Sequence, residues 1–371
     1  MWYIVYFCCF IMSFLLSLIL VPVARKFATK HGMLDHPGEW KIHLKPKPLL
    51  GGAAICISFI VTVLINLLIL FCCSEIFCLI HLMPDFLLSE IHLIKAVLPK
   101  LAVILVGGIF ICVLGLVDDT IHKLSVKTKL MGQIMVALLL ISFGIRITLF
   151  IENNFISSII TVVWIIGITN AFNLLDNMDG LSAGVAVIAS MIFFVITAFQ
   201  GQVFTATILL VLAGSIFGFL RYNMHPARIF MGDAGSMFIG YILAVLTVVS
   251  SYYTKSSPTF FPVVMPILIL GVPIFDTISV IIVRIENKRS ILQGDMNHFS
   301  HRLVNLGMTQ KQAVWFIYLV TFCVGINALL LCFANIWGAG IILVQTVCIF
   351  IIIAILERIA KRNSDKKSEN S

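Results

Sequence analysis

The stretch LAVILVGGIFICVLGLVDDT, residues 101–120, decides the fold class of this chain. Residues 101–117 carry no charged side chain, and Asp118 and Asp119 follow them directly. An uncharged apolar run of about 17–25 residues crosses the ~30 Å hydrocarbon core of a bilayer as an α-helix. The stretch therefore predicts a membrane helix that ends in an acidic pair.

Similar apolar runs recur along nearly the whole chain of 371 residues, of which 60% are hydrophobic and 11% charged. This composition excludes an ordinary soluble domain. The runs lack the alternation of a membrane barrel, so helices are the remaining way to satisfy the backbone in lipid. We expect an all-α polytopic membrane protein, with one membrane domain over residues 1–356 and a basic, disordered cytoplasmic tail over 357–371.

About eleven transmembrane helices are predicted between charged or turn-rich breaks. They cover residues 3–22, 50–72, 101–117, 130–147, 155–174, 181–199, 203–220, 236–253, 261–283, 313–333 and 340–356. Segment 73–100 is too interrupted to span. We expect it to form a periplasmic, interfacial excursion with a short amphipathic helix.

Basic residues are distributed unevenly between the two sides that these spans define. One side carries 21 of the 25 Lys and Arg, and it holds residues 25–48, 118–129, 221–233, 284–312 and the tail. Cytoplasmic loops are enriched in positive side chains. We therefore expect the N-terminus outside and the C-terminus in the cytoplasm of a cell inner membrane. The net charge of +8 follows from this bias and gives no reason to expect nucleic-acid binding.

Polar residues gather at the cytoplasmic end of the fifth predicted helix. Asn170, Asn173, Asp176 and Asp179 are spaced by three, which puts all four on one face if the helix continues through them. Four such side chains suit a polar cleft better than lipid. The alternative of a solvated cap, which has even odds for Asp118 and Asp119 taken alone, is weaker here.

Asp233 stands in MGDAGS, directly before the eighth predicted helix. Backbone N–H groups at a helix N-terminus hold phosphate, while simple N-capping by Asp233 is the alternative. Lysines at 123, 127 and 129 follow the acidic pair and suit further phosphate charge, or they are ordinary cytoplasmic lysines.

Loop 284–312 contains MNHFSHRL, with His298, Ser300, His301 and Arg302. Its histidines suit hydrogen bonds to a sugar or phosphate better than metal binding. Carboxylate and amide oxygens without nearby thiolates favour Mg²⁺ or Mn²⁺. The chain thus combines acidic residues that could bind a metal, basic residues that could bind phosphates, and an apolar interior that is open to lipid. Together these features indicate phosphoryl transfer between a nucleotide and a lipid.

These motifs, in this order and topology, closely resemble the polyprenyl-phosphate N-acetylhexosamine-1-phosphate transferases, the glycosyltransferase 4 family. Its WecA/TagO-like branch is nearest, and the MurNAc-pentapeptide transferase MraY is related. The resemblance runs from HGMLDHPGEWKIHLKPKPLLGG (31–52) to HFSHRLVNLGMTQ (298–310). It implies transfer of a sugar 1-phosphate from a UDP-sugar to undecaprenyl phosphate with release of UMP, as the first membrane step of a cell-envelope polysaccharide pathway.

The resemblance also implies roles for individual residues. It places Mg²⁺ or Mn²⁺ on Asn173 and Asp233. It also makes Asp118, Asp119 and Asp233 catalytic residues, with Asp119 as a base for the lipid phosphate. The other implied contacts are nucleotide and sugar binding by Asn170, Asp176, Asp179, His298, His301 and Arg302, phosphate binding by Lys127 and Lys129, and first-loop contacts by Lys41, His43 and Lys47.

The sequence departs from the family pattern in three places. Ser300 replaces the middle histidine of the usual His-x-His-His, Trp40 stands where an arginine is usual, and segment 73–100 is longer than the family needs. The first loop reads KPLLGG (47–52) instead of a TPTMGG-like sequence, which favours UDP-N-acetylglucosamine over UDP-MurNAc-pentapeptide or another UDP-N-acetylhexosamine.

Several alternatives stay open at this stage. A secondary transporter also has many helices and buried acids, but here the polar residues gather at one face. A CDP-alcohol phosphotransferase is disfavoured because residues 179–184 read DGLSAG, without the arginine that ends the DGxxAR pattern of those enzymes. Direct displacement and a covalent aspartyl-phosphate route are both compatible with the motifs. The downstream polymer and the oligomeric state, a homodimer included, are not determined.

Overall fold

Helices account for nearly all of the structure, a computed structural model that describes residues 2–37, 45–79, 85–121, 124–148, 152–252, 259–288, 290 and 298–369; for 73–79, 85–96 and 359–369 it describes the backbone alone. The helices are α1 (Trp2–Lys30), α2 (Gly51–Leu79), α3 (Asp85–Ile121), α4 (Val126–Ser142), α5 (Asn154–Leu175), α6 (Leu181–Phe199), α7 (Val203–Asn223), α8 (Gly232–Val249), η1 (Phe261–Val264), α9 (Met265–Ile269), α10 (Gly271–Glu286), α11 (Phe299–Asn305), α12 (Gln310–Leu330) and α13 (Ile336–Glu369). Two short strands, β1 (Leu34–Asp35) and β2 (Lys47–Pro48), pair antiparallel.

Nine helices within the described ranges are long and apolar enough to cross a membrane. A further bent pair, Phe261–Ile269 with Gly271–Glu286, passes the same test as one span broken by 68°. The remaining predicted span corresponds to α4, which has 17 residues. The helical, multi-pass membrane class expected from the sequence is therefore confirmed.

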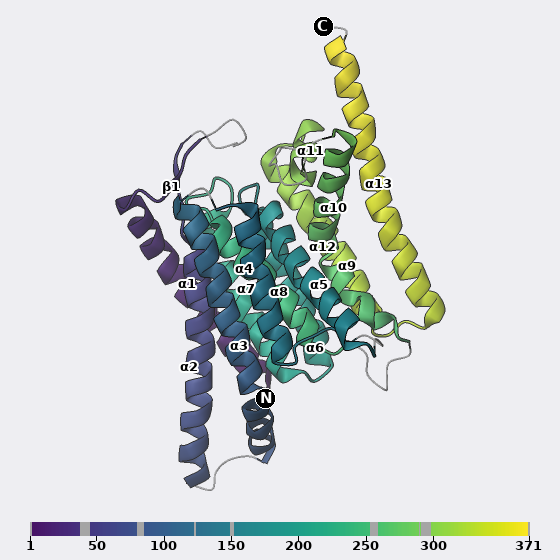
Figure 1. Cartoon of the computed structure of the whole chain (residues 1–371). Coiled ribbons are helices and arrows are strands. Elements are labelled where there is room, and N and C mark those ends of the chain that lie inside the picture. Colours follow the sequence, from purple (N-terminus) through teal and green to yellow (C-terminus); the bar gives the residue numbers. More distant parts are fainter. Residues whose placement is uncertain are drawn as a thin grey trace.

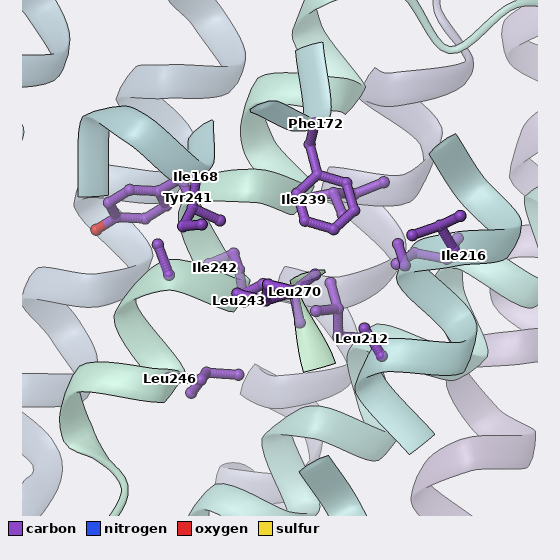
Figure 2. Close-up of a cluster of buried hydrophobic side chains, with 14 of the residues drawn as sticks. Ile168, Phe172, Leu212, Ile216, Ile239, Tyr241, Ile242, Leu243, Leu246 and Leu270 are labelled. Atoms are coloured by element: carbon purple, nitrogen blue, oxygen red, sulfur yellow. The ribbon is translucent and has the colours of Figure 1, made fainter. Parts of the chain in front are cut away.

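Helix α8 lies in the middle of the bundle and is packed by α3, α5 and α2 (Figure 1). Its side chains meet those of α5 and α7 in an apolar cluster that Figure 2 shows, with Ile168, Phe172, Leu212, Ile216, Ile239, Tyr241, Ile242, Leu243, Leu246 and Leu270 labelled. Helix α13 is the least buried of the nine, and Trp337 near its start is 82% exposed. Exposed apolar side chains of this kind are what a lipid-facing helix presents.

Glycines bring two other helices onto the start of α8. A Cβ on Gly52 of α2 would lie 2.1 Å from the backbone nitrogen of Gly235, and one on Gly115 of α3 would lie 2.4 Å from that of Ala234. The backbone of α2 also bonds to the preceding segment, since Gly52 N donates to Met231 O at 2.9 Å. The first turn of α8 is therefore held by backbone packing from two sides.

The segment 73–100 adopts a different form from the separate short helix expected at this position. Residues up to Leu79 continue α2, and residues from Asp85 onward continue α3 without a break to Ile121. Both extensions project beyond the neighbouring helices at the end of the bundle opposite α11 (Figure 1). The apolar residues of this stretch favour helix continuation over a new element.

The C-terminal segment also differs from expectation, because α13 continues as helix to Glu369 where a disordered tail was predicted. Residues 357–369 contain no Gly or Pro and are rich in Lys, Arg and Glu, which are good helix formers. The start of α1 and the end of α13, which are the two ends of the chain, lie at opposite ends of the bundle (Figure 1).

We predict that Gly115→Ala destabilises the protein by roughly 1–3 kcal/mol, because the new methyl group meets backbone atoms of α8 that have no room to move. Thermal unfolding of the detergent-solubilised protein measures the effect as a lower melting temperature. The matched control is Gly167→Ala, since a Cβ at Gly167 meets nothing within 4 Å. An equal melting temperature for the two variants would contradict the packing argument.

Candidate active site

Lys129 joins two of the predicted catalytic aspartates. Its Nζ lies 2.5 Å from Asp118 Oδ2 and 2.5 Å from Asp233 Oδ2. The three residues come from the end of α3, the first turn of α4 and the first turn of α8. All three side chains are largely shielded, with 18%, 19% and 27% of the Asp118, Lys129 and Asp233 side chains exposed. The ammonium group thus balances two carboxylates that approach each other at the edge of the bundle.

Asp119 caps α8 from a neighbouring helix. Its Oδ1 accepts the Asp233 N–H at 2.9 Å and its Oδ2 accepts the Ala234 N–H at 3.1 Å. Gly232, with φ +70°, makes room for this carboxylate, because a Cβ there would lie 2.4 Å from Asp119 Oδ2. The sequence favoured a phosphate or Asp233 as the partner of these amides, whereas the structure gives them to Asp119.

Asn173 and Asp233, the predicted metal ligands, lie side by side. Asn173 Nδ2 donates to Asp233 Oδ1 and to Ser236 Oγ, both at 3.0 Å. One carboxylate and one amide provide oxygen donors that suit Mg²⁺ or Mn²⁺. Within the described ranges no three His, Cys, Asp or Glu side chains are grouped as a metal cage. Mg²⁺ rarely needs such a cage, because substrate phosphates and water complete its coordination.

Asp176 follows the last residue of α5 as its C-cap. Burial first, and then the charges of Asp233, Asp119 and Asp179, raise the pKa of the Asp176 carboxyl well above its ordinary value. This shift favours the neutral form of the carboxyl, and a cation bound nearby would offset the neighbouring charges. Asp176 therefore belongs to the same electrostatic centre as Asp233.

The four polar residues of 170–179 do not share one face, because α5 ends at Leu175. The chain then turns, and Gly180 adopts φ +76° before α6 begins. Asn173 faces α8, while Asp179 faces the loop after α7, where its Oδ2 accepts the Ala227 N–H at 2.9 Å and lies 2.9 Å from His225 Nδ1. The helical-stripe interpretation is therefore wrong for the part beyond Leu175.

The first loop reaches the same region through Lys47. Its Nζ donates to the carbonyl oxygen of Ala227, whose N–H is held by Asp179. Lys41 and His43 lie outside the described residues. Lys127 is exposed on the first turn of α4.

Asn170 lies one helical turn deeper than Asn173 and is bonded to α4. Its Nδ2 donates to Gln133 Oε1 at 2.6 Å and to Ile166 O at 2.8 Å. Gln133 is 1% exposed and stands four residues after Lys129, on the same side of α4. No role is predicted for Gln133 from the sequence, although a lone glutamine inside an apolar run is a signal of a buried polar partner.

The histidine segment is anchored by an acid inside α10. His298 Nδ1 lies 2.9 Å from Asp276 Oδ2, and the Phe299 N–H donates to Asp276 Oδ1 at 2.6 Å. His298 and His301 are each 6% exposed, with ring centroids 6.3 Å apart. Asp276 lies inside an apolar run of the sequence, and its histidine partner lies 22 residues further along the chain.

Arg302 contacts α10 and α13. Its Nε lies 3.0 Å from Glu357 Oε2 on α13, and its guanidinium donates to Ser279 Oγ on α10 at 2.7 Å. The contacts described for Arg302 therefore anchor α11, and its contact with a nucleotide or sugar stays a prediction. Ser300 donates to Asn177 Oδ1 at 2.5 Å and so links α11 to the turn that holds Asp176 and Asp179.

Comparison with known proteins shows the family of the chain. Residues 101–251, from α3 to the end of α8, match the family model of glycosyl transferase family 4. A Bacillus subtilis protein named "Probable undecaprenyl-phosphate N-acetylglucosaminyl 1-phosphate transferase" is 38% identical over 95% of this chain and 90% of its own.

Two further relatives are more distant. The decaprenyl-phosphate N-acetylglucosaminephosphotransferase of Mycolicibacterium smegmatis is 30% identical over 80% of this chain and 74% of its own. The phospho-N-acetylmuramoyl-pentapeptide-transferase of Bacillus subtilis is 29% identical over 80% and 87%. Because residues 101–251 match the family model and the first Bacillus subtilis relative is 38% identical over 95% of this chain, the chain belongs to glycosyl transferase family 4.

Proposed function

We propose that the protein transfers N-acetylglucosamine 1-phosphate from UDP-N-acetylglucosamine to undecaprenyl phosphate and releases UMP. The observation that carries the proposal is the cluster of Asp118, Lys129, Asp233 and Asn173 at the ends of four membrane helices. A cluster at this depth is open to a water-soluble nucleotide and to the phosphate of a lipid whose chain stays in the bilayer. The Bacillus subtilis relative that is 38% identical is named as an N-acetylglucosaminyl 1-phosphate transferase, and this supports an N-acetylglucosamine donor over a muramoyl-pentapeptide donor.

In the proposed reaction a phosphate oxygen of the lipid attacks the β-phosphorus of the UDP-sugar. The new P–O bond forms as the bond from the β-phosphorus to the bridging oxygen breaks, and that oxygen leaves with UMP. A phosphate monoester has a second pKa near ~6 and is largely dianionic at pH 7. Positioning and charge neutralisation are therefore the main requirements of the site, and a strong base is not needed.

The environment of Asp119 favours direct displacement over a covalent aspartyl-phosphate. Both of its oxygens accept backbone hydrogen bonds, and the residue is 8% exposed. A nucleophile needs an accessible oxygen in line with the phosphorus, whereas Asp119 is committed to the start of α8. We assign Asp119 to holding Asp233 in place, and Lys129 to the phosphate charge.

Asn173 and Asp233 would hold the Mg²⁺ or Mn²⁺ of this reaction, because the two side chains lie against each other, with Asn173 Nδ2 donating to Asp233 Oδ1, and both carry oxygens of the kind that a hard cation prefers. Such an ion, when bound, neutralises the pyrophosphate and stabilises the departing UMP. Lys129 already lies against Asp233, so it is placed to share the same phosphate charge.

The proposal includes eleven spans, with the N-terminus outside and the site at the cytoplasmic face of the inner membrane. The bent pair and α4 complete the nine spans found by length and composition. The excess of Lys and Arg in the loops on the side of the site supports this orientation. A UDP-sugar donor is found in the cytoplasm, so the proposed reaction also requires the site to face that side.

We predict that Asp233→Asn lowers UMP release by at least about 100-fold, because it removes a charge that the metal and Lys129 both use. The assay contains purified protein, undecaprenyl phosphate, Mg²⁺ and a panel of UDP-N-acetylhexosamines. Glu152→Gln, an exposed acid outside the site, is the control and should retain activity. A wild-type protein that releases no UMP with any donor in the panel would refute the proposed function in favour of a transporter.

We predict that Mn²⁺ binds more tightly as the pH rises from 6 to 8.5. Asp176 has a raised pKa and must lose its proton to face a cation, so proton release accompanies binding and high pH favours it. Electron paramagnetic resonance of free Mn²⁺ measures the dissociation constant without turnover. In Asp176→Asn the pH dependence should become flatter; an unchanged slope would show that Asp176 takes no part.

We predict that green fluorescent protein fused to the C-terminus is fluorescent, and that alkaline phosphatase fused at the same place is inactive. The first reporter works in the cytoplasm and the second only outside it. The opposite pair of results would reverse the proposed orientation.

A further inference from the structure

Ser300 makes a buried contact that joins two separate parts of the site. It lies in α11, is 1% exposed, and its Oγ is 2.5 Å from Asn177 Oδ1. Asn177 belongs to the turn between α5 and α6. Its Nδ2 donates to Leu174 O at 2.9 Å, so the amide oxygen is the atom that faces Ser300. The Ser300 hydroxyl is therefore the donor, and both groups are satisfied.

The neighbours of Ser300 in α11 are held from other directions. His298 is bonded to Asp276 of α10, and Arg302 is paired with Glu357 of α13. These contacts place α11 relative to the last helices of the bundle. The Ser300–Asn177 bond instead places α11 relative to the turn that carries Asp176 and Asp179.

Size matters at this contact as much as the hydrogen bond does. Ser300 is almost completely enclosed, and the amide of Asn177 occupies the space directly in front of its hydroxyl. The family pattern that this segment resembles has a histidine at this position. An imidazole is several atoms larger than a hydroxyl and does not fit while Asn177 keeps its side chain. The small side chain of Ser300 and the longer side chain of Asn177 are thus complementary in size.

We infer that Ser300 and Asn177 form a positioning pair that holds the histidine segment against the acidic turn and so sets the geometry in which the UDP-sugar is bound. The pair touches no reacting atom and acts through its neighbours, His298 and His301 on one side and Asp176 and Asp179 on the other. The inference rests on the proposed function for its kinetic consequence, while the contact itself is a property of the free protein.

The kinetic test uses Ser300→Ala, Asn177→Ala and the double variant, with UDP-N-acetylglucosamine as the varied substrate. Each single variant should lower kcat/KM by about ten-fold, the loss expected for one buried hydrogen bond. The loss should appear mainly as a higher KM for the donor. The double variant should lose no more than either single one, because all three remove the same interaction. Additive losses would overturn the inference.

Size complementarity is tested by Ser300→His, with and without Asn177→Ala. The single variant should lose about 100-fold in kcat/KM, and the double variant should recover to the level of Asn177→Ala alone. A double variant as weak as Ser300→His would overturn the argument. Ser190→Ala is the matched control, because it removes a buried hydroxyl that has no hydrogen-bond partner among the described residues.

Hydrogen–deuterium exchange tests the contact without any substrate. In Ser300→Ala and Asn177→Ala, backbone amides of residues 299–305 should exchange faster than in the wild type, while those of α8 stay protected. Equal exchange would overturn the inference whatever the kinetics show. If the wild type releases no UMP, the proposed function fails, and the exchange experiment decides on the contact by itself.

Discussion

The Lys129 ammonium between Asp118 and Asp233 is the interaction on which the rest of the site depends. Two carboxylates at the edge of a membrane bundle repel each other and lose hydration, and one cation at 2.5 Å from each offsets both effects. Because the three side chains come from α3, α4 and α8, the charge balance also fixes where these helices end relative to one another. The position of Asn173 follows, since it is bonded to the same Asp233.

Close helix packing makes this charge cluster possible. Gly52 and Gly115 let α2 and α3 approach the first turn of α8 at backbone distance, and Gly232 leaves space for the Asp119 carboxylate. In lipid, small residues at an interface allow dispersion forces and hydrogen bonds to hold helices together. The glycines that allow the close packing of the bundle therefore also determine where Asp119 and Asp233 lie.

Local patterns in the sequence were enough to predict the helical membrane class, and the motifs pointed to the family. The family resemblance, and no local pattern, put Asn173 and Asp233 at one site, where the structure brings them into contact. Local patterns failed where a partner lies far along the chain. The carboxylate that caps α8 is Asp119, 114 residues from Asp233, and the anchor of Arg302 is Glu357 on the last helix. The spacing of three in 170–179 misled for a related reason, because the end of α5 depends on the turn through Gly180 and its contacts.

The ion pair between Arg302 and Glu357 sets a boundary for shortening the chain. Helix α13 is mostly exposed and contributes no residue to the acidic centre, so it looks dispensable. A chain cut before Glu357 would keep every predicted site residue, yet it would leave the buried guanidinium of Arg302 without its carboxylate and loosen α11. Tags and fusions are therefore better joined after this residue than in place of it.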